Sequence, residues 1–193
     1  MPGLRRTAML LFCLLPGLLA MPGALASTYF AEQVSIAEHT LRRIGTGTAR
    51  YAGVIRVYEA ALYAPSASTR AQILDAAVPR RLEIVYRRPL DAQLLAAVAA
   101  QTLERQHGAE TLRHWQAQID SLHAAFRDVS DGDRLALSMA PEHGLWLEFN
   151  GREVARINKP QFGRLYFGIW LGDPPLSASL RDALLPGDCC QAE

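Results

Sequence analysis

Apolar residues recur along this 193-residue chain in two periods, one typical of strands and one typical of helices. Short stretches that are rich in β-branched and aromatic residues, or that alternate apolar with polar residues, predict β-strands. These stretches cover residues 34–41, 54–63, 81–87, 135–139, 145–149 and 153–157. Gly45 and Gly47 are expected to form the turn between the first two strands.

The last two predicted strands flank Asn150-Gly151, a pair typical of a two-residue hairpin turn. A strict two-residue loop places Phe149 opposite Arg152 and Leu147 opposite Val154. That register mixes apolar and charged side chains on one face, so a pairing shifted by one residue stays open.

Helical periodicity dominates two other regions. Asp91 is expected to cap a helix over residues 92–106, and Gly108 interrupts the run before a second helix. The second helix has a single apolar stripe, so the two helices are predicted to form an antiparallel hairpin packed on a sheet. The stripe consists of Leu112, Trp115, Ile119, Leu122 and Phe126.

Three further helices are predicted. Residues 69–76 form a short one, Pro160 opens a helix that Gly172 closes, and residues 177–185 form the last. The order of strands, helices, strands and helices predicts an α+β fold, with a largely antiparallel sheet and helices packed on one face.

The first 26 residues are typical of a signal peptide. Arg5 and Arg6 precede an apolar run, and Ala24-Leu25-Ala26 matches a cleavage site before Ser27. The alternative is an N-terminal membrane anchor, but Pro16 interrupts the run, which is shorter than a span requires. We therefore expect one domain over residues 27–193 in a periplasmic or secreted protein, with no stable membrane span after cleavage.

Charge and cysteine content exclude several classes of function. Arg5 and Arg6 are two of the 20 basic residues, and none of the 19 acidic residues precedes Ser27, so the mature chain has a formal charge of −1. A nucleic-acid partner is therefore not expected. Cys189 and Cys190 are adjacent, which disfavours a disulfide between them. No histidines or cysteines have metal-ligand spacing, so neither a metal nor another cofactor is predicted.

Candidate chemistry gathers around Arg50, which lies just before a predicted strand that contains Tyr58 and Tyr63. An arginine prefers a carboxylate or phosphate partner, and a tyrosine joins an apolar body to a polar tip. The three residues suit an amphiphile with an acidic head group. Two alternatives remain: Arg50 pairs with an internal acid such as Glu59, or the tyrosines are ordinary core residues.

Several motifs in order resemble the bacterial exported branch of the chalcone isomerase-like family. They are Gly45-x-Gly47-x-x-Arg50, then Val57-Tyr58-x-Ala60-x-Leu62-Tyr63, then Trp170-Leu171-Gly172-Asp173-Pro174-Pro175 with Leu180-Arg181-x-x-Leu184-Leu185. The resemblance implies an open-faced β-sandwich whose antiparallel sheet and helices enclose a ligand cleft. It also implies that Arg50 contacts the ligand, as the matching arginine does in the plant enzymes. Tyr58 falls where those enzymes have a threonine that orders a catalytic water, and Tyr63 matches their strand-ending tyrosine.

The chain departs from the plant enzymes in the helix that follows. Those enzymes use a tyrosine and an asparagine there, whereas residues 91–103 contain neither, and Leu94 or Leu95 stands where the phenol is expected. The sequence therefore favours a non-catalytic protein that binds a hydrophobic carboxylic acid, such as a fatty acid, in an apolar cleft ending at Arg50, with Tyr58 and Tyr63 as further ligand contacts. Relatives in this fold that are not enzymes bind fatty acids in that manner.

Two alternatives stay open. One is an isomerase or intramolecular lyase in which Arg50 stabilises an oxyanion and a tyrosine donates the proton. The other is a structural role in the cell envelope, with the cleft filled by side chains.

Overall fold

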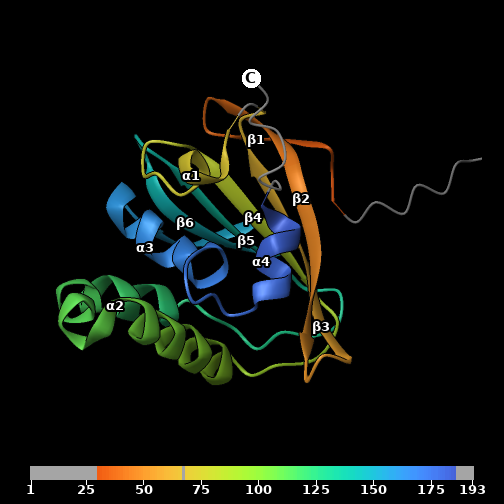
Figure 1. Cartoon of the computed structure of the whole chain (residues 1–193). Coiled ribbons are helices and arrows are strands. Elements are labelled where there is room, and N and C mark those ends of the chain that lie inside the picture. Colours follow the sequence, from red (N-terminus) through yellow and green to blue (C-terminus); the bar gives the residue numbers. More distant parts are fainter. Residues whose placement is uncertain (1–29, 67, 186–193) are drawn as a thin grey trace, which may run out of the picture.

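One antiparallel sheet organises the molecule (Figure 1). The computed structural model describes residues 30–66 and 68–185, so the predicted signal peptide and Cys189-Cys190 lie outside the described residues. Each of the seven strands pairs with its neighbour along the chain. The strands are β1 (Gln33–Ile36), β2 (His39–Tyr51), β3 (Ile55–Ala64), β4 (Arg80–Tyr86), β5 (Arg134–Ala140), β6 (Gly144–Phe149) and β7 (Arg152–Ile157).

The helices cover one face of this sheet, which confirms the predicted α+β fold. They are α1 (Arg70–Ile73), α2 (Ala92–His123), α3 (Pro160–Leu171) and α4 (Ala178–Leu184). Helix α3 packs on β5 and β6, α4 packs on β2 and β3, and α2 packs on α3 and β7. None of the helices in the described part of the chain combines the length and the apolar character needed to cross a membrane.

Helix α2 is two limbs rather than one rod. Gly108 has φ +73° and ψ 159°, which is not helical. A bridge joins Leu90 to Val129, and the Ala92 N–H donates to Asp128 Oδ1 at 2.9 Å, so the two ends of α2 lie together. A straight helix of 32 residues would separate its ends by about 48 Å. The limbs therefore fold back on each other, as the predicted hairpin requires.

The first predicted strand and turn are wrong. The chain turns earlier, at Ala37-Glu38, and separates β1 from β2. Gly45 and Gly47 then lie inside β2, where they allow α4 to approach closely. A Cβ on Gly45 would stand 2.2 Å from the Leu184 carbonyl oxygen. These glycines serve the packing of a helix on the strand and not a turn.

The β6–β7 hairpin follows the prediction at its turn and departs from it one pair further on. Phe149 pairs with Arg152 as expected, but Leu147 pairs with Ala155 and not with Val154. An irregularity in the register between Leu147 and Glu148 accounts for the shift, because a β-bulge inserts one extra residue on one strand.

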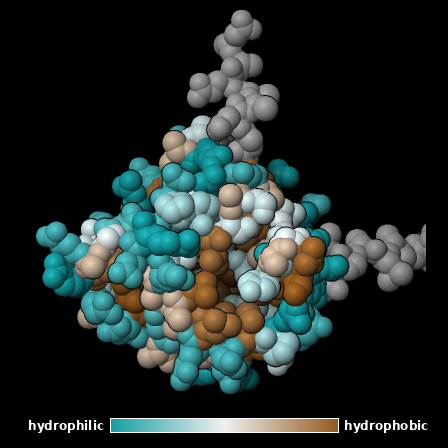
Figure 2. Space-filling model, turned by 60° about the horizontal axis from the view of Figure 1, so that its bottom comes forward, coloured by the Kyte–Doolittle hydropathy of each residue, from teal (hydrophilic) through white to brown (hydrophobic). Residues whose placement is uncertain are grey.

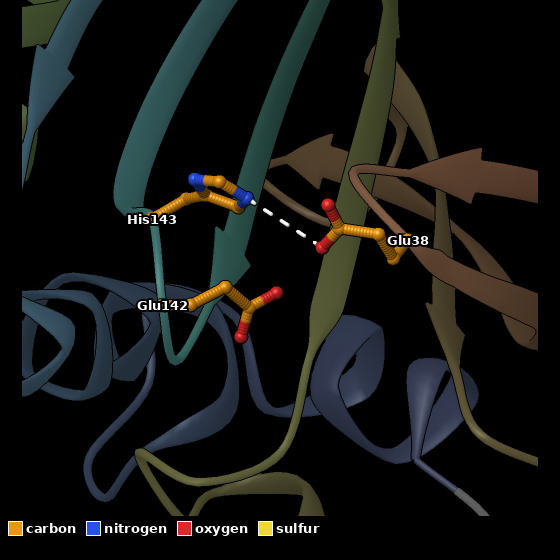
Figure 3. Close-up of side chains that lie close together, drawn as sticks. All are labelled: Glu38, Glu142 and His143. Carbon is orange, nitrogen blue, oxygen red and sulfur yellow. Dashed lines mark ion pairs between the residues drawn. The ribbon is translucent and has the colours of Figure 1, made fainter.

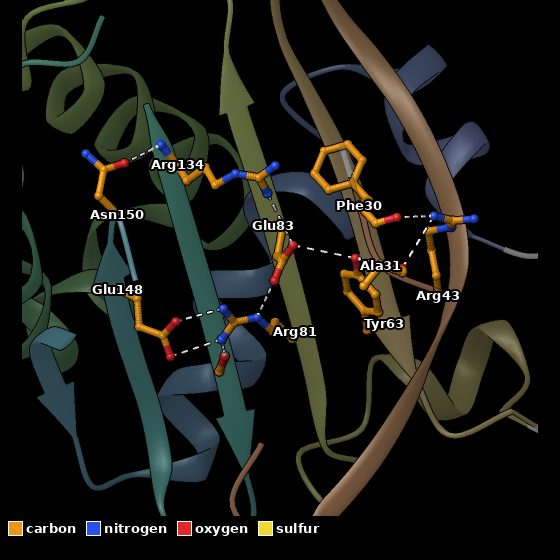
Figure 4. Close-up of polar contacts among 10 residues, drawn as sticks. Phe30, Ala31, Arg43, Tyr63, Arg81, Glu83, Arg134, Glu148 and Asn150 are labelled. Carbon is orange, nitrogen blue, oxygen red and sulfur yellow. Dashed lines mark hydrogen bonds and ion pairs between the residues drawn. The ribbon is translucent and has the colours of Figure 1, made fainter. Parts of the chain in front are cut away.

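Two apolar clusters lie on opposite faces of the sheet. The larger one includes the inner side chains of β3–β6 and the apolar faces of the helices. The smaller one gathers Phe30, Ile36, Tyr63 and Trp146 on the outer face. Figure 4 shows the polar contacts beside it, where Arg81 bonds Glu148 at 2.7 Å and Glu83 at 2.8 Å. The outer face is thus filled by the chain's own side chains.

Candidate ligand-binding cavity

A cavity of about 530 Å³ lies between the inner face of the sheet and helices α2 and α3. This volume is within the range of small-molecule sites. Figure 2 shows hydrophobic surface around a hollow on this side of the molecule. The walls are almost entirely apolar, with Ile84, Leu135, Leu137 and Leu147 from the sheet and Leu95, Val98, Ala99, Ile169 and Trp170 from the helices. The expectation that side chains fill the cleft is therefore not met.

Strand alternation explains which sheet residues line the cavity. Ile84 and Tyr86 are two positions apart on β4, and Leu135 and Leu137 are two apart on β5, so each pair faces inward. Leu135 on β5 pairs with Ile84 on β4, so the inward-facing residues of the two strands lie side by side. On α2, Leu94, Leu95 and Val98 recur at helical spacing and cover the opposite wall.

Three tyrosine hydroxyls supply polarity within these walls. Tyr58 and Tyr86 contact each other edge to face, with ring centroids 5.9 Å apart, and Trp170 Nε1 donates a hydrogen bond to the Tyr58 hydroxyl at 3.1 Å. Burial raises the pKa of Tyr58 to about 12, although the hydrogen bond from Trp170 acts in the opposite direction. Burial likewise raises the pKa of Tyr86 and of Tyr166, whose hydroxyl lies 3.0 Å from His123 Nε2. These phenols stay neutral at physiological pH.

Five exposed lining residues form the mouth of the cavity. They are Arg50, Tyr51, Ile55, Arg88 and Leu94. They come from the end of the β2–β3 hairpin, from the residues after β4 and from the first turns of α2. The mouth thus joins apolar side chains to two cations, while the interior is apolar.

Arg50 lines this mouth and does not lie at the inner end of the cleft, as the sequence had led us to expect. It pairs with Arg56 next to an irregularity in the register after Ala49, near the exposed end of the β2–β3 hairpin, and its side chain is exposed. Its Nη1 donates to the Val54 carbonyl oxygen at 3.3 Å. The alternative pairing with Glu59 is wrong, because Glu59 bonds Arg87 at 2.8 Å on the outer face.

Arg88 is a second cation at the mouth that our sequence reasoning missed. It follows Ile84 and Tyr86 at alternate positions, and this continuation of the inward-facing set was the signal that could have found it. Among the described residues, its guanidinium has no hydrogen-bond or ion-pair partner. Arg88 therefore offers a guanidinium to an anion without first breaking an internal contact.

Tyr58 and Tyr63 lie on opposite faces of the sheet. Tyr58 lines the cavity, whereas Tyr63 is fully buried in the outer cluster. The Tyr63 hydroxyl donates to the Ala31 carbonyl oxygen at 3.2 Å and lies 3.5 Å from a Glu83 carboxylate oxygen (Figure 4). Five positions separate the two tyrosines on one strand, and an odd spacing places side chains on opposite faces. Tyr63 is therefore placed away from the cavity and not beside Arg50.

The described residues contain one cluster with metal-ligating side chains, in two turns at the surface. Glu38, Glu142 and His143 lie together, with His143 Nε2 3.8 Å from Glu38 (Figure 3). His39 pairs with Glu142 at 2.7 Å. These polar contacts join the β1–β2 and β5–β6 turns, and no part of the cluster lines the cavity.

The curled antiparallel sheet, the helices on one face and the apolar cavity between them define an α+β protein of open-faced architecture. The chain belongs to the chalcone isomerase-like family, whose model matches residues 23–186. It is similar in structure to a fatty-acid binding protein of Arabidopsis thaliana (AtFAP1), with a TM-score of 0.59 and 14% sequence identity. That match covers 80% of this chain and 89% of the other. No curated protein matches the sequence.

Leu94 and Leu95 both line the cavity, so the positions where the resemblance implies a catalytic phenol carry leucines that face the candidate site. Tyr58 also faces the cavity. Leucines therefore stand in the cavity lining where the resemblance implies a phenol, Leu94 at the mouth and Leu95 in the wall.

Proposed function

We propose that this protein binds a fatty acid, or a similar hydrophobic carboxylic acid, in the cavity without transforming it. The observation that supports this proposal is an apolar cavity of about 530 Å³ whose cations lie at its mouth. Burial of the acyl chain supplies affinity, at about 0.8 kcal/mol for each methylene group. The similarity to a fatty-acid binding protein agrees with this proposal at the level of the fold.

The carboxylate lies at the mouth, between Arg50 and Arg88. An unpaired carboxylate inside the apolar walls would cost far more than the chain gains, whereas a guanidinium can bind it with two parallel hydrogen bonds. Arg88 has no competing partner among the described residues. Arg50 would lose only its hydrogen bond of 3.3 Å to the Val54 carbonyl oxygen. Inside the cavity, the Tyr58 hydroxyl is a polar group whose position is held by the hydrogen bond from Trp170.

The isomerase alternative receives less support from this geometry. Oxyanion stabilisation needs donors directed at the reacting oxygen, together with a proton donor within reach. Arg50 has the Val54 carbonyl as its hydrogen-bond partner, and burial makes Tyr58 a weaker acid than an ordinary tyrosine.

We also propose that the protein acts in the periplasm or outside the cell, in line with the predicted signal peptide.

The test compares a fatty acid with its methyl ester by isothermal titration calorimetry. Arg50→Gln and Arg88→Gln are each expected to weaken binding of the acid about fivefold, the effect of one exposed ion pair worth about 1 kcal/mol. The ester should bind the wild type and both variants alike, because it has no charge. Arg152→Gln is the matched control, since Arg152 is an exposed arginine outside the cavity lining.

A second variant tests the cavity itself. Ala99 is a small, buried residue of the lining, so Ala99→Phe places a ring where the acyl chain should lie. We expect this variant to fold and to bind neither the acid nor the ester. Undiminished binding by Ala99→Phe, or acid binding that no arginine substitution weakens, would contradict the proposal.

A further inference from the structure

The large apolar side chains that the described part of the chain exposes gather at one place. They are Tyr51, Val54, Ile55 and Leu94, and the two most exposed are Tyr51 at 71% and Val54 at 73%. Tyr51, Ile55 and Leu94 line the mouth of the cavity, and Val54 lies in the turn between the first two. We call these four residues the lip. Soluble proteins rarely expose such a group without a partner for it.

Arginines surround the lip. Arg50, Arg56 and Arg88 are exposed and lie within the β2–β3 hairpin or directly after β4. Arg56 has an acidic partner, Glu59, at 3.4 Å, whereas Arg50 and Arg88 have none among the described residues. Two exposed acids lie near Leu94 at the start of α2: Asp91, its cap, and Asp128, which accepts a hydrogen bond from the Ala92 N–H. The edge of the lip is therefore cationic on the side of the β2–β3 hairpin and of the residues after β4, where Arg50 and Arg88 have no acidic partner among the described residues.

An apolar centre within a cationic edge matches the surface of a bilayer that contains anionic lipids. Apolar side chains enter the boundary between head groups and acyl chains, tyrosine favours the interface, and arginines attract anionic head groups. The β2–β3 hairpin projects at one end of the molecule (Figure 1), and the hollow opens within the hydrophobic surface of Figure 2. This shape allows the lip to meet a flat surface.

We propose that the lip docks on the surface of an anionic lipid bilayer, with Val54 entering the bilayer and Arg50 and Arg88 contacting lipid phosphates. The cavity then opens directly onto the acyl-chain region, so a fatty acid passes between bilayer and protein without crossing water. This transfer rests on the function proposed above, whereas docking is a separate property of the surface.

The experiment places a tryptophan reporter in the full chain. Val54→Trp is mixed with vesicles of phosphatidylcholine and phosphatidylglycerol in equal parts, whose acyl chains carry bromine as a quencher. Ala71→Trp is the matched control, because Ala71 is exposed on α1, at the other end of β3 from the lip. Wild-type fluorescence is subtracted from both. The N-terminal segment is the same in both variants, so attachment through it leaves the contrast intact.

We expect the tryptophan introduced by Val54→Trp to shift to shorter wavelength and to be quenched, and the one introduced by Ala71→Trp to be unaffected. Neutral phosphatidylcholine vesicles should bind more weakly, and Arg50→Gln with Arg88→Gln should weaken docking about 25-fold, or about fivefold for each arginine. The proposal would be overturned if the two positions were quenched equally, if the tryptophan at position 54 were not quenched, or if binding were the same for anionic and neutral vesicles.

Val54→Asn separates docking from ligand binding, because Val54 does not line the cavity and asparagine adds no charge beside Arg50. This variant should lose docking and keep its affinity for a fatty acid in solution. A wild type that docks but binds no fatty acid would contradict the function proposed above and leave docking standing. If sedimentation shows that the wild type is a dimer and Val54→Asn a monomer, the lip is covered by a second copy and the bilayer proposal is wrong.

Discussion

The hydroxyl of Tyr58 is the polar group that most directly reports the state of the cavity. It accepts a hydrogen bond from Trp170 at 3.1 Å, and burial raises its pKa to about 12. In the unfolded chain a tyrosine ionises near pH 10. The folded state therefore keeps a proton that the unfolded state releases, and this tyrosine's contribution to stability is complete below pH 10 and is lost as the pH rises toward 12.

We predict that Tyr58→Phe flattens the loss of stability in alkali. Between about pH 10 and pH 12, the free energy of unfolding should fall less steeply than in the wild type, by up to about 1.4 kcal/mol per pH unit. At neutral pH the variant should lose roughly 1 kcal/mol, because Trp170 Nε1 loses its acceptor. Urea unfolding at a series of pH values measures both effects.

Tyr51→Phe is the matched control, since Tyr51 is 71% exposed and should leave the slope unchanged. If Tyr58→Phe and wild type have the same slope, the Tyr58 hydroxyl is solvated and the cavity is wetter than its walls indicate.

Sequence reasoning at this scale identified Arg50 and Tyr58 as lining residues but misplaced Arg50 and Tyr63. Tyr63 was placed with Tyr58 because the two share a strand, although their odd spacing puts them on opposite faces. Arg50 was expected inside the cleft because the motif gives its place in the chain and not the direction of its side chain. Arg88 belongs to no motif, so only the alternation of β4 pointed to it.

At the scale of the elements, contact between β2 and α4 depends on glycine. A Cβ on Gly45 would meet backbone atoms of Leu184, which cannot rotate away, whereas one on Gly47 would meet the Leu180 side chain at 2.7 Å and the Ala183 Cβ at 2.9 Å. The strand and the helix can thus lie closer than side chains would permit. This packing places β2, and with it Arg50, beside the cavity.

We predict that Gly45→Ala costs about 3 kcal/mol and that Gly47→Ala costs less, about 2 kcal/mol, because a Cβ at position 45 meets backbone carbonyl groups, whereas at position 47 the Leu180 methyl group can rotate away and only the Ala183 Cβ is fixed. Urea midpoints at equal m-values measure the difference. Equal losses for the two variants would show that α4 shifts freely on β2, contrary to the packing described above.

The positions of most elements could be predicted from periodicity and from capping residues. Pro160, Gly172 and Ser177 mark helix ends where the structure has them, and Gly108 divides α2 as expected. The errors lie where a tertiary contact overrides a local signal. Gly45 resembled a turn residue but serves a helix contact, and the register shift after Leu147 depends on pairing that no local pattern determines.

For the whole molecule, the fold could be anticipated because several weak motifs occur in family order, and the family match over residues 23–186 confirms that assignment. The cavity was not predictable from periodicity alone, since a strand face or a helix face that lines a hollow has the same apolar pattern as one that packs against a neighbour. Its volume and the place of its mouth come from the arrangement of β3–β6 under α2 and α3.

The proposed function sets the orientation of a bound acid, with the acyl chain among the leucines and the carboxylate at the mouth. A crystal structure with a fatty acid brominated at its terminal carbon tests this most directly, because anomalous scattering locates the bromine. We predict a bromine peak beside Leu137 and Leu147, and a carboxylate within hydrogen-bond distance of Arg50 or Arg88. A bromine at the mouth, a carboxylate among the leucines, or no bromine in the cavity would contradict the account.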